Sequence, residues 1–131
     1  MGELNPLAVV LATVAFWVVG AIWYGILFGR AWRAETGIVQ PPQGSRMALI
    51  MALTLAFEML VVLTLAHLVA RTDPAPHVVY MMAAGFALTV MTPAIGINYL
   101  HQGKSLPLFL IDAGHFLFGM LAAAGILVAL G

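Results

Sequence analysis

The chain has 131 residues, of which 63% are hydrophobic and only 8% are charged. Soluble domains usually carry about a quarter charged residues, so this chain could not cover itself with a polar surface. It is predicted to be an integral membrane protein in contact with the lipid bilayer. Five basic and five acidic residues cancel, and no basic run indicates a nucleic-acid partner. The absence of cysteine excludes disulfides and thiolate metal sites.

Four apolar segments are long enough to cross a bilayer, which takes about 20 residues of helix. They predict an all-α fold, an integral membrane four-helix bundle with short loops, in a single domain over residues 1–131. The spans are expected near residues 6–28, 46–70, 76–100 and 105–130. The first span is expected to be retained rather than cleaved as a signal peptide, because only Glu3 is charged before it and the apolar run is too long.

Local signals mark where these helices begin and where one of them bends. A capping side chain followed by proline opens the first span at Asn5-Pro6, and the same signature recurs at Asp73-Pro74. Ser45 and Ser105 are the expected caps of the second and fourth spans. Pro93 falls inside the third span, where it cannot donate to the carbonyl of Thr89. A kink is therefore predicted there.

The end of the first span is rich in aromatic and basic residues. Tryptophan and tyrosine prefer the headgroup level of a bilayer, and arginine extends its charge into the same layer. The sequence therefore predicts a cytoplasmic interfacial belt, rather than a catalytic cluster, made of Trp23, Tyr24, Arg30, Trp32 and Arg33.

Small residues predict where helices approach closely. Gly25 and Gly29 form a GxxxG pair at the end of the first span, a weak signal by itself. Gly119 and Ala122 lie on the fourth span and let another helix come near. These four positions are the predicted helix-packing residues.

Basic residues in the loops predict the orientation, because they are enriched on the cytoplasmic side. The loops after the first and third spans hold four of them, Arg30, Arg33, Arg46 and Lys104, whereas the opposite side holds only Arg71. Both termini are therefore expected on the non-cytoplasmic side of the membrane.

A small set of polar residues interrupts the apolar spans. Asp112 and His115 are three residues apart, so they share one face of a helix, and Glu58 lies at the centre of the second span. Counted at about 1.5 Å per residue from the cytoplasmic side, the depths are about 18 Å for Glu58, 15 Å for His115, 10 Å for Asp112 and 12 Å for Thr92. These four residues form the predicted buried polar set. Its ionisable members are expected to face the protein interior, because lipid exposure would be costly.

Two hypotheses explain such a layer equally well. If Glu58, Asp112 and His115 also share one face, they form a coupled proton-sharing set suited to a proton relay or a small cation site. Alternatively, they are polar contacts that hold helices together, with the acids neutral and hydrogen-bonded.

Two motifs resemble a bacterial membrane family known as domain of unknown function 1761. The first is Asn5-Pro6 followed by Gly20-x-x-Trp23-Tyr24-Gly25-x-Leu27-Phe28-Gly29-x-x-Trp32. The second runs from Asn98-Tyr99-Leu100 through Gly103-Lys104-Ser105-Leu106-x-Leu108-Phe109-Leu110-Ile111 to Gly114-His115. The resemblance covers essentially the whole chain and implies a compact four-helix inner-membrane protein. It implies no established activity, so it assigns no catalytic residue.

Three classes of function compete. An accessory or scaffold subunit of a membrane complex, packing through small-residue helix faces against other subunits or in a homodimer, is favoured by the short loops. A small proton-coupled transporter or a protein that binds an ion or solute would use the Glu58, Asp112 and His115 set. An enzyme is the weakest of the three, because no nucleophile, metal-ligand spacing or phosphate loop supports it. The sequence predicts no catalytic residues and no metal site, and it indicates no particular cofactor.

Overall fold

The computed structural model describes residues 3–131, which fold into helices without any β-strand. Their bounds are α1 Pro6–Ile22, the π-helix η1 Trp23–Leu27, α2 Gly29–Thr36, α3 Gly44–Thr72, α4 Pro76–Phe86, the π-helix η2 Ala87–Met91, α5 Thr92–Gln102 and α6 Leu106–Leu130. Four continuous stretches are long and apolar enough to cross a membrane: Pro6–Leu27, Gly44–Thr72, Pro76–Gln102 and Leu106–Leu130. The predicted all-α membrane fold is confirmed.

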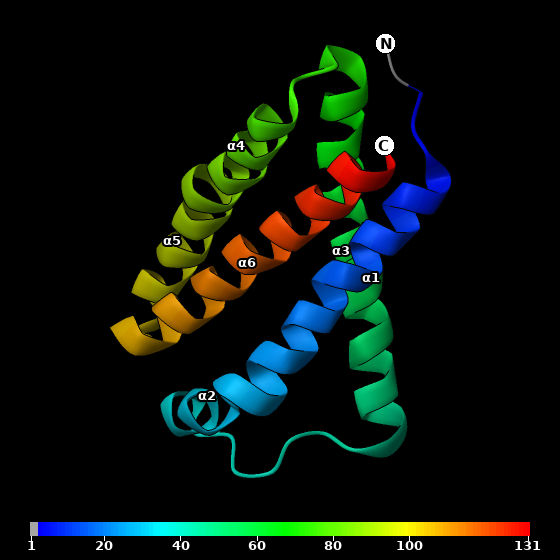
Figure 1. The fold of residues 1–131 in the computed structure, drawn as a ribbon. Helices are drawn as coiled ribbons and strands as arrows, with labels where there is room; N and C mark the ends of the chain where they lie inside the picture. Colours follow the sequence, from blue (N-terminus) through cyan, green and yellow to red (C-terminus); the bar gives the residue numbers. More distant parts are fainter. Residues whose placement is uncertain (1–2) are drawn as a thin grey trace.

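The α1 and α6 helices lie side by side in opposite directions through the middle of the molecule (Figure 1). The start of α1 therefore meets the end of α6, where the Asn5 side chain donates to the carbonyl of Leu130 at 3.0 Å. The α3 helix packs mainly on α1, and the continuous span formed by α4, η2 and α5 packs on α6. The order across the bundle is therefore α3, α1, α6 and then α4 with α5.

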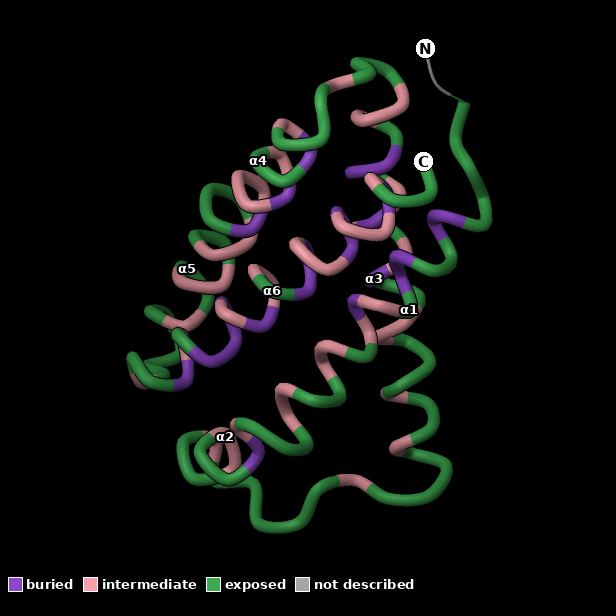
Figure 2. Tube along the Cα trace, in the orientation of Figure 1, coloured by how far each residue is buried: buried purple, intermediate pink, exposed green. Residues whose placement is uncertain are grey.

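The apolar core occupies the half of the bundle that contains the termini. Alanines of α1 and α6 let the helices approach, and larger side chains such as Phe16, Leu65 and Met120 fill the space between them. The fully buried members include Ala12, Phe16, Leu65, Ala83 and Ala123. The first half of α3, in contrast, is mostly exposed (Figure 2). The buried ionisable residues therefore lie in the opposite half of the bundle.

Two of the predicted helix caps form and two do not. The Asn5 side chain accepts from the backbone N–H groups of Leu7 and Ala8, and Ser105 accepts from that of Leu108 at 3.2 Å. The second span begins earlier, at Gly44, so Ser45 lies inside the helix. Asp73 ends α3 in a left-handed conformation with φ 46°, and Ala75 precedes α4. Capping residues can end a helix as well as begin one, because aspartate tolerates positive φ better than most residues.

The connection between the first two spans contains an additional short helix that the sequence did not indicate. An eight-residue helix, α2, follows the π-helical turn and ends at Gly37, whose φ of 76° suits glycine. This helix lies against the start of α6, where the Ser105 hydroxyl donates to the carboxylate of Glu35. The residues after the first span are thus part of the folded unit.

The predicted bend at Pro93 takes the form of a π-helical segment. Because Pro93 has no N–H and its ring crowds the carbonyl of Thr89, the preceding turn widens over Ala87–Met91. The N–H of Thr92 bonds five residues back to Ala87. The Thr89 hydroxyl donates to the carbonyl of Gly85. The π-helical turn divides the third span into α4 and α5.

Candidate functional site

One face of α6 carries both of its ionisable residues into the interior. Asp112 is 8% exposed and His115 is 6% exposed. They lie one turn apart on the face that α6 presents to α1 and α5, because residues three positions apart are neighbours on a helix. Each of them meets a different set of partners.

The first set is a tyrosine–aspartate cluster made of Tyr24, Tyr99 and Asp112. The Tyr24 hydroxyl donates to Oδ1 of Asp112, and the Tyr99 hydroxyl donates to Oδ2. The three residues come from η1, α5 and α6, so one carboxyl group joins three helical segments. Both of its oxygens are hydrogen-bonded, as buried polar groups normally are.

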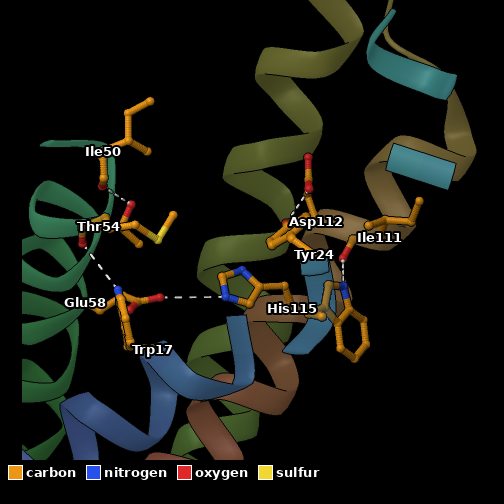
Figure 3. Close-up of polar contacts among 10 residues, drawn as sticks. Trp17, Tyr24, Ile50, Thr54, Glu58, Ile111, Asp112 and His115 are labelled. Atoms are coloured by element: carbon orange, nitrogen blue, oxygen red, sulfur yellow. Dashed lines mark hydrogen bonds and ion pairs between the residues drawn. The ribbon is translucent and has the colours of Figure 1, made fainter. Parts of the chain in front are cut away.

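The second set is a glutamate–histidine pair made of Glu58 and His115 (Figure 3). Nε2 of His115 lies 3.7 Å from Oε2 of Glu58, which is within ion-pair distance but beyond a hydrogen bond. Glu58 is only 4% exposed and comes from the middle of α3. Over residues 3–131, three buried polar atoms have no hydrogen-bond partner, namely Oε1 of Glu58, Nε2 of His115 and Oγ1 of Thr92. The pair therefore contains two of the three unpartnered atoms.

A glycine and three aromatic rings hold the imidazole of His115. A Cβ built on Gly20 of α1 would lie 2.9 Å from Nε2, so only a glycine leaves room for the ring there. The rings of Phe16, Tyr24 and Phe116 surround it with centroid distances of 5.7, 5.1 and 4.8 Å. Tyr24 thus contacts both the aspartate and the histidine.

The α3 side of the pair is shaped by local hydrogen bonds. Thr54, one turn before Glu58, donates to the carbonyl of Ile50 at 2.7 Å. Trp17 of α1 donates to the carbonyl of Met51 at 3.3 Å, which ties α1 to the exposed half of α3. Both contacts lie beside Glu58 in Figure 3.

The predicted interfacial belt divides into an inner and an outer part. Tyr24 belongs to the tyrosine–aspartate cluster, and Trp23 donates to the carbonyl of Ile111 at 2.8 Å, so the polar groups of both bond to α6. The interfacial position of these residues stays a prediction, and the hydrogen bonds add contacts to α6 that the sequence did not indicate. Arg30 is exposed, Arg33 and Trp32 are partly buried, and the ring of Trp32 lies 5.9 Å from that of Tyr24.

The predicted packing residues also differ in what they contact. Gly119 lies directly under the ring of Phe16, whose nearest carbon would be 2.5 Å from an added Cβ. Gly25 is exposed, and a Cβ built on it would have no atom within 4 Å. A Cβ built on Gly29 would lie nearest to the carbonyl oxygen of Tyr24 in the preceding turn. The nearest atoms around the Gly25–Gly29 pair in the described residues therefore come from the same part of the chain and not from another span. Ala122 is only partly buried, and Ala123 and Ala124 beside it are completely buried.

Sequence reasoning missed two residues of the site. Both Tyr99 and Gly20 were named only within the two motifs that resemble the family. The sequence positions of both residues gave only weak evidence that they belong to the site. Tyr99 lies about four residues before the turn that leads to α6, and Gly20 lies one helical turn before Tyr24. Thr92 of the predicted set is partly buried, with its hydroxyl oxygen unpartnered.

The donor types present do not make a metal centre. Over the described part of the chain, no group of three or more histidine, cysteine, aspartate or glutamate residues could hold a metal ion. What the arrangement can do is share and move protons, because carboxyl, imidazole and phenol groups lie in contact inside the bundle.

Four apolar helical spans around buried ionisable groups define a small multi-pass membrane protein. The family model described as "Protein of unknown function (DUF1761)" matches residues 7–128. The chain therefore belongs to this family. No protein of curated function and no solved structure matches it.

Proposed function

We propose that the protein is a small proton-coupled membrane transporter in which Glu58 and His115 carry the exchangeable proton. The observation that supports this is the pair itself, two ionisable side chains at 3.7 Å, each more than nine-tenths buried. Ionisable residues within membrane spans are costly and commonly mark ion or proton pathways.

The unpartnered atoms of the pair favour exchange over a structural role. A buried polar atom without a hydrogen bond costs about 1–3 kcal/mol, and Glu58 and His115 contribute one such atom each. Asp112 differs from the pair, because both of its oxygens accept hydrogen bonds from tyrosines. The pair is thus the part of the site that gains from taking up or passing on a proton.

The geometry suits a proton that moves within the pair. Glutamic acid with neutral imidazole and carboxylate with imidazolium have the same total charge, so the proton can pass between Glu58 and His115 without placing net charge in the hydrocarbon. An approach of about 0.8 Å would bring the two atoms to a normal hydrogen bond. Net gain or loss of a proton leaves a charge in the bilayer, which is unfavourable unless a second ion or solute compensates it. This is the physical basis for coupling.

The orientation follows from the basic residues. Arg30, Arg33, Arg46 and Lys104 gather at the end of the bundle that carries α2, and Arg71 lies at the end of α3 near the opposite side. The end with α2 is therefore assigned to the cytoplasm and both termini to the other side of a bacterial inner membrane.

The experiment is proton flux in liposomes that contain the purified protein and an internal pH dye. After a pH gradient is imposed with Na⁺ and K⁺ present as possible compensating ions, wild type should dissipate the gradient faster than protein-free liposomes, and Glu58→Gln should fall to their level. Glu3→Gln is the matched control, because it makes the same change at an exposed residue outside the spans. Wild-type flux equal to that of Glu58→Gln would contradict the proposal.

The second candidate is an accessory subunit that packs against other membrane proteins or a second copy. The tyrosine–aspartate cluster supports it, because its bonds are complete and tie together three helical segments. Background-level flux in wild type and both variants would favour this role.

A further inference from the structure

A groove of about 400 Å³ opens between α5 and α6 at the end of the bundle that carries α2. Its walls come from both helices and from the turn that connects them, and most are apolar. The residues that line it are Gly96, Tyr99, Leu100, Lys104, Ser105, Leu106 and Phe109. Lys104 is the one charged side chain in this lining, and it is exposed in the turn that connects the two helices.

Tyr99 is shared between this groove and the tyrosine–aspartate cluster. Its side chain lines the groove, and its hydroxyl donates to Oδ2 of Asp112. Asp112 itself is 8% exposed and does not line the groove. Tyr24 donates to the other oxygen of Asp112 but does not line the groove either. Of the two tyrosines, only Tyr99 connects the carboxyl group to the groove.

We propose that Tyr99 passes protons from the groove between α5 and α6 to Asp112, so that the glutamate–histidine pair is loaded from the end of the bundle with α2. This inference rests on the proposed proton-coupled function and adds to it a route and a side of entry. It depends on the position of Tyr99 between the groove and a buried carboxyl group.

The transfer conserves atoms and charge at the tyrosine. Oη of Tyr99 accepts a proton from a hydronium ion in the groove while its own hydroxyl proton moves to Oδ2 of Asp112. The phenol ends as it began, the hydronium becomes water, and the carboxylate becomes a carboxylic acid. From there, the proton moves to the imidazole of His115, one helical turn away on α6 at about 5–6 Å between Cβ atoms. This step returns Asp112 to the carboxylate, and His115 can pass the proton to Glu58.

The two tyrosines provide a matched pair of variants. Tyr99→Phe and Tyr24→Phe each keep the ring and remove one hydrogen bond to Asp112, so a purely structural role predicts equal effects. The route predicts that Tyr99→Phe lowers proton flux by about 100-fold or more, the lower end of what a positioned proton donor contributes. Tyr24→Phe should lose much less. Melting temperatures of the two variants are measured alongside to show that both fold.

A second measurement tests the groove and its side directly. The chain has no cysteine, so Leu106→Cys introduces a single thiol in the groove lining. A membrane-impermeant, positively charged methanethiosulfonate added outside liposomes should then block the molecules whose α2 end faces outward. Gln40→Cys is the control, because Gln40 is exposed in the loop before α3. The reagent should label it in the same fraction of molecules, and the proton flux of this variant should stay unchanged.

The outcomes separate this inference from the proposed function. Flux that depends on Glu58 but falls equally in Tyr99→Phe and Tyr24→Phe overturns the route alone. So does flux through Leu106→Cys that survives complete labelling from the α2 side. Wild-type flux no faster than in protein-free liposomes overturns the proposed function and this route with it. The larger loss in Tyr99→Phe together with the one-sided block supports the route.

Discussion

Replacement of Gly20 by alanine tests how the histidine is held in place. The added Cβ would lie 2.9 Å from Nε2 of His115 and 3.6 Å from Cδ2. Normal contacts begin at about 3.5 Å, so the imidazole must retreat by about 0.6 Å. The rings of Phe16 and Phe116 stand close around it and limit that movement.

Two opposing terms set the size of the effect. Overpacking of this kind costs about 1–3 kcal/mol, whereas alanine in place of glycine within a helix gains about 1 kcal/mol. Gly20→Ala should therefore change the free energy of unfolding by between about 0 and −2 kcal/mol. Gly25→Ala is the control, because an added Cβ there meets nothing within 4 Å. The two variants should differ by about 1–3 kcal/mol, which is the overpacking cost alone.

The assay is thermal unfolding of both variants in the same lipid nanodiscs, with and without His115→Ala. Removal of the imidazole removes the clash, so Gly20→Ala should be far less harmful in the His115→Ala background, and the double-mutant cycle measures this coupling. If Gly20→Ala is as stable as Gly25→Ala, or if His115→Ala gives no relief, then the glycine does not position the ring and the reasoning fails.

Three further predictions concern packing, capping and topology. Gly119→Ala should destabilise the protein, because its Cβ would come 2.5 Å from the ring of Phe16; Gly85→Ala, with open space around it, serves as the control in the same unfolding assay. Ser105→Ala should cost about 1 kcal/mol through the lost cap of α6, seen as a lower melting temperature, and an unchanged value would contradict the role of the bond to the N–H of Leu108. Reporter fusions should place the loop at Gln40 in the cytoplasm and Gly131 on the other side, and a cytoplasmic carboxyl terminus would reverse the assigned orientation.

The sequence by itself determined the class of the fold. Chain composition, the length of the apolar runs and the caps at Asn5 and Ser105 are local properties, and a bilayer requires that backbone polar groups be satisfied within each helix. Four spanning helices follow from these rules without knowledge of how they pack. The inward direction of Glu58, Asp112 and His115 was also predictable from the cost of charge in lipid, and all three are buried.

Only the tertiary structure decided which of these residues meet. Glu58 contacts His115 across 57 positions of sequence, and Asp112 pairs instead with two tyrosines. An aromatic residue near a helix end can serve the membrane interface or a buried acceptor equally well, and Tyr24 and Tyr99 take the second role because α6 brings Asp112 within reach. The same holds for small residues: Gly119 meets Phe16 whereas Gly25 meets nothing. Packing between helices depends on side chains far apart in the sequence, and no local pattern specifies it.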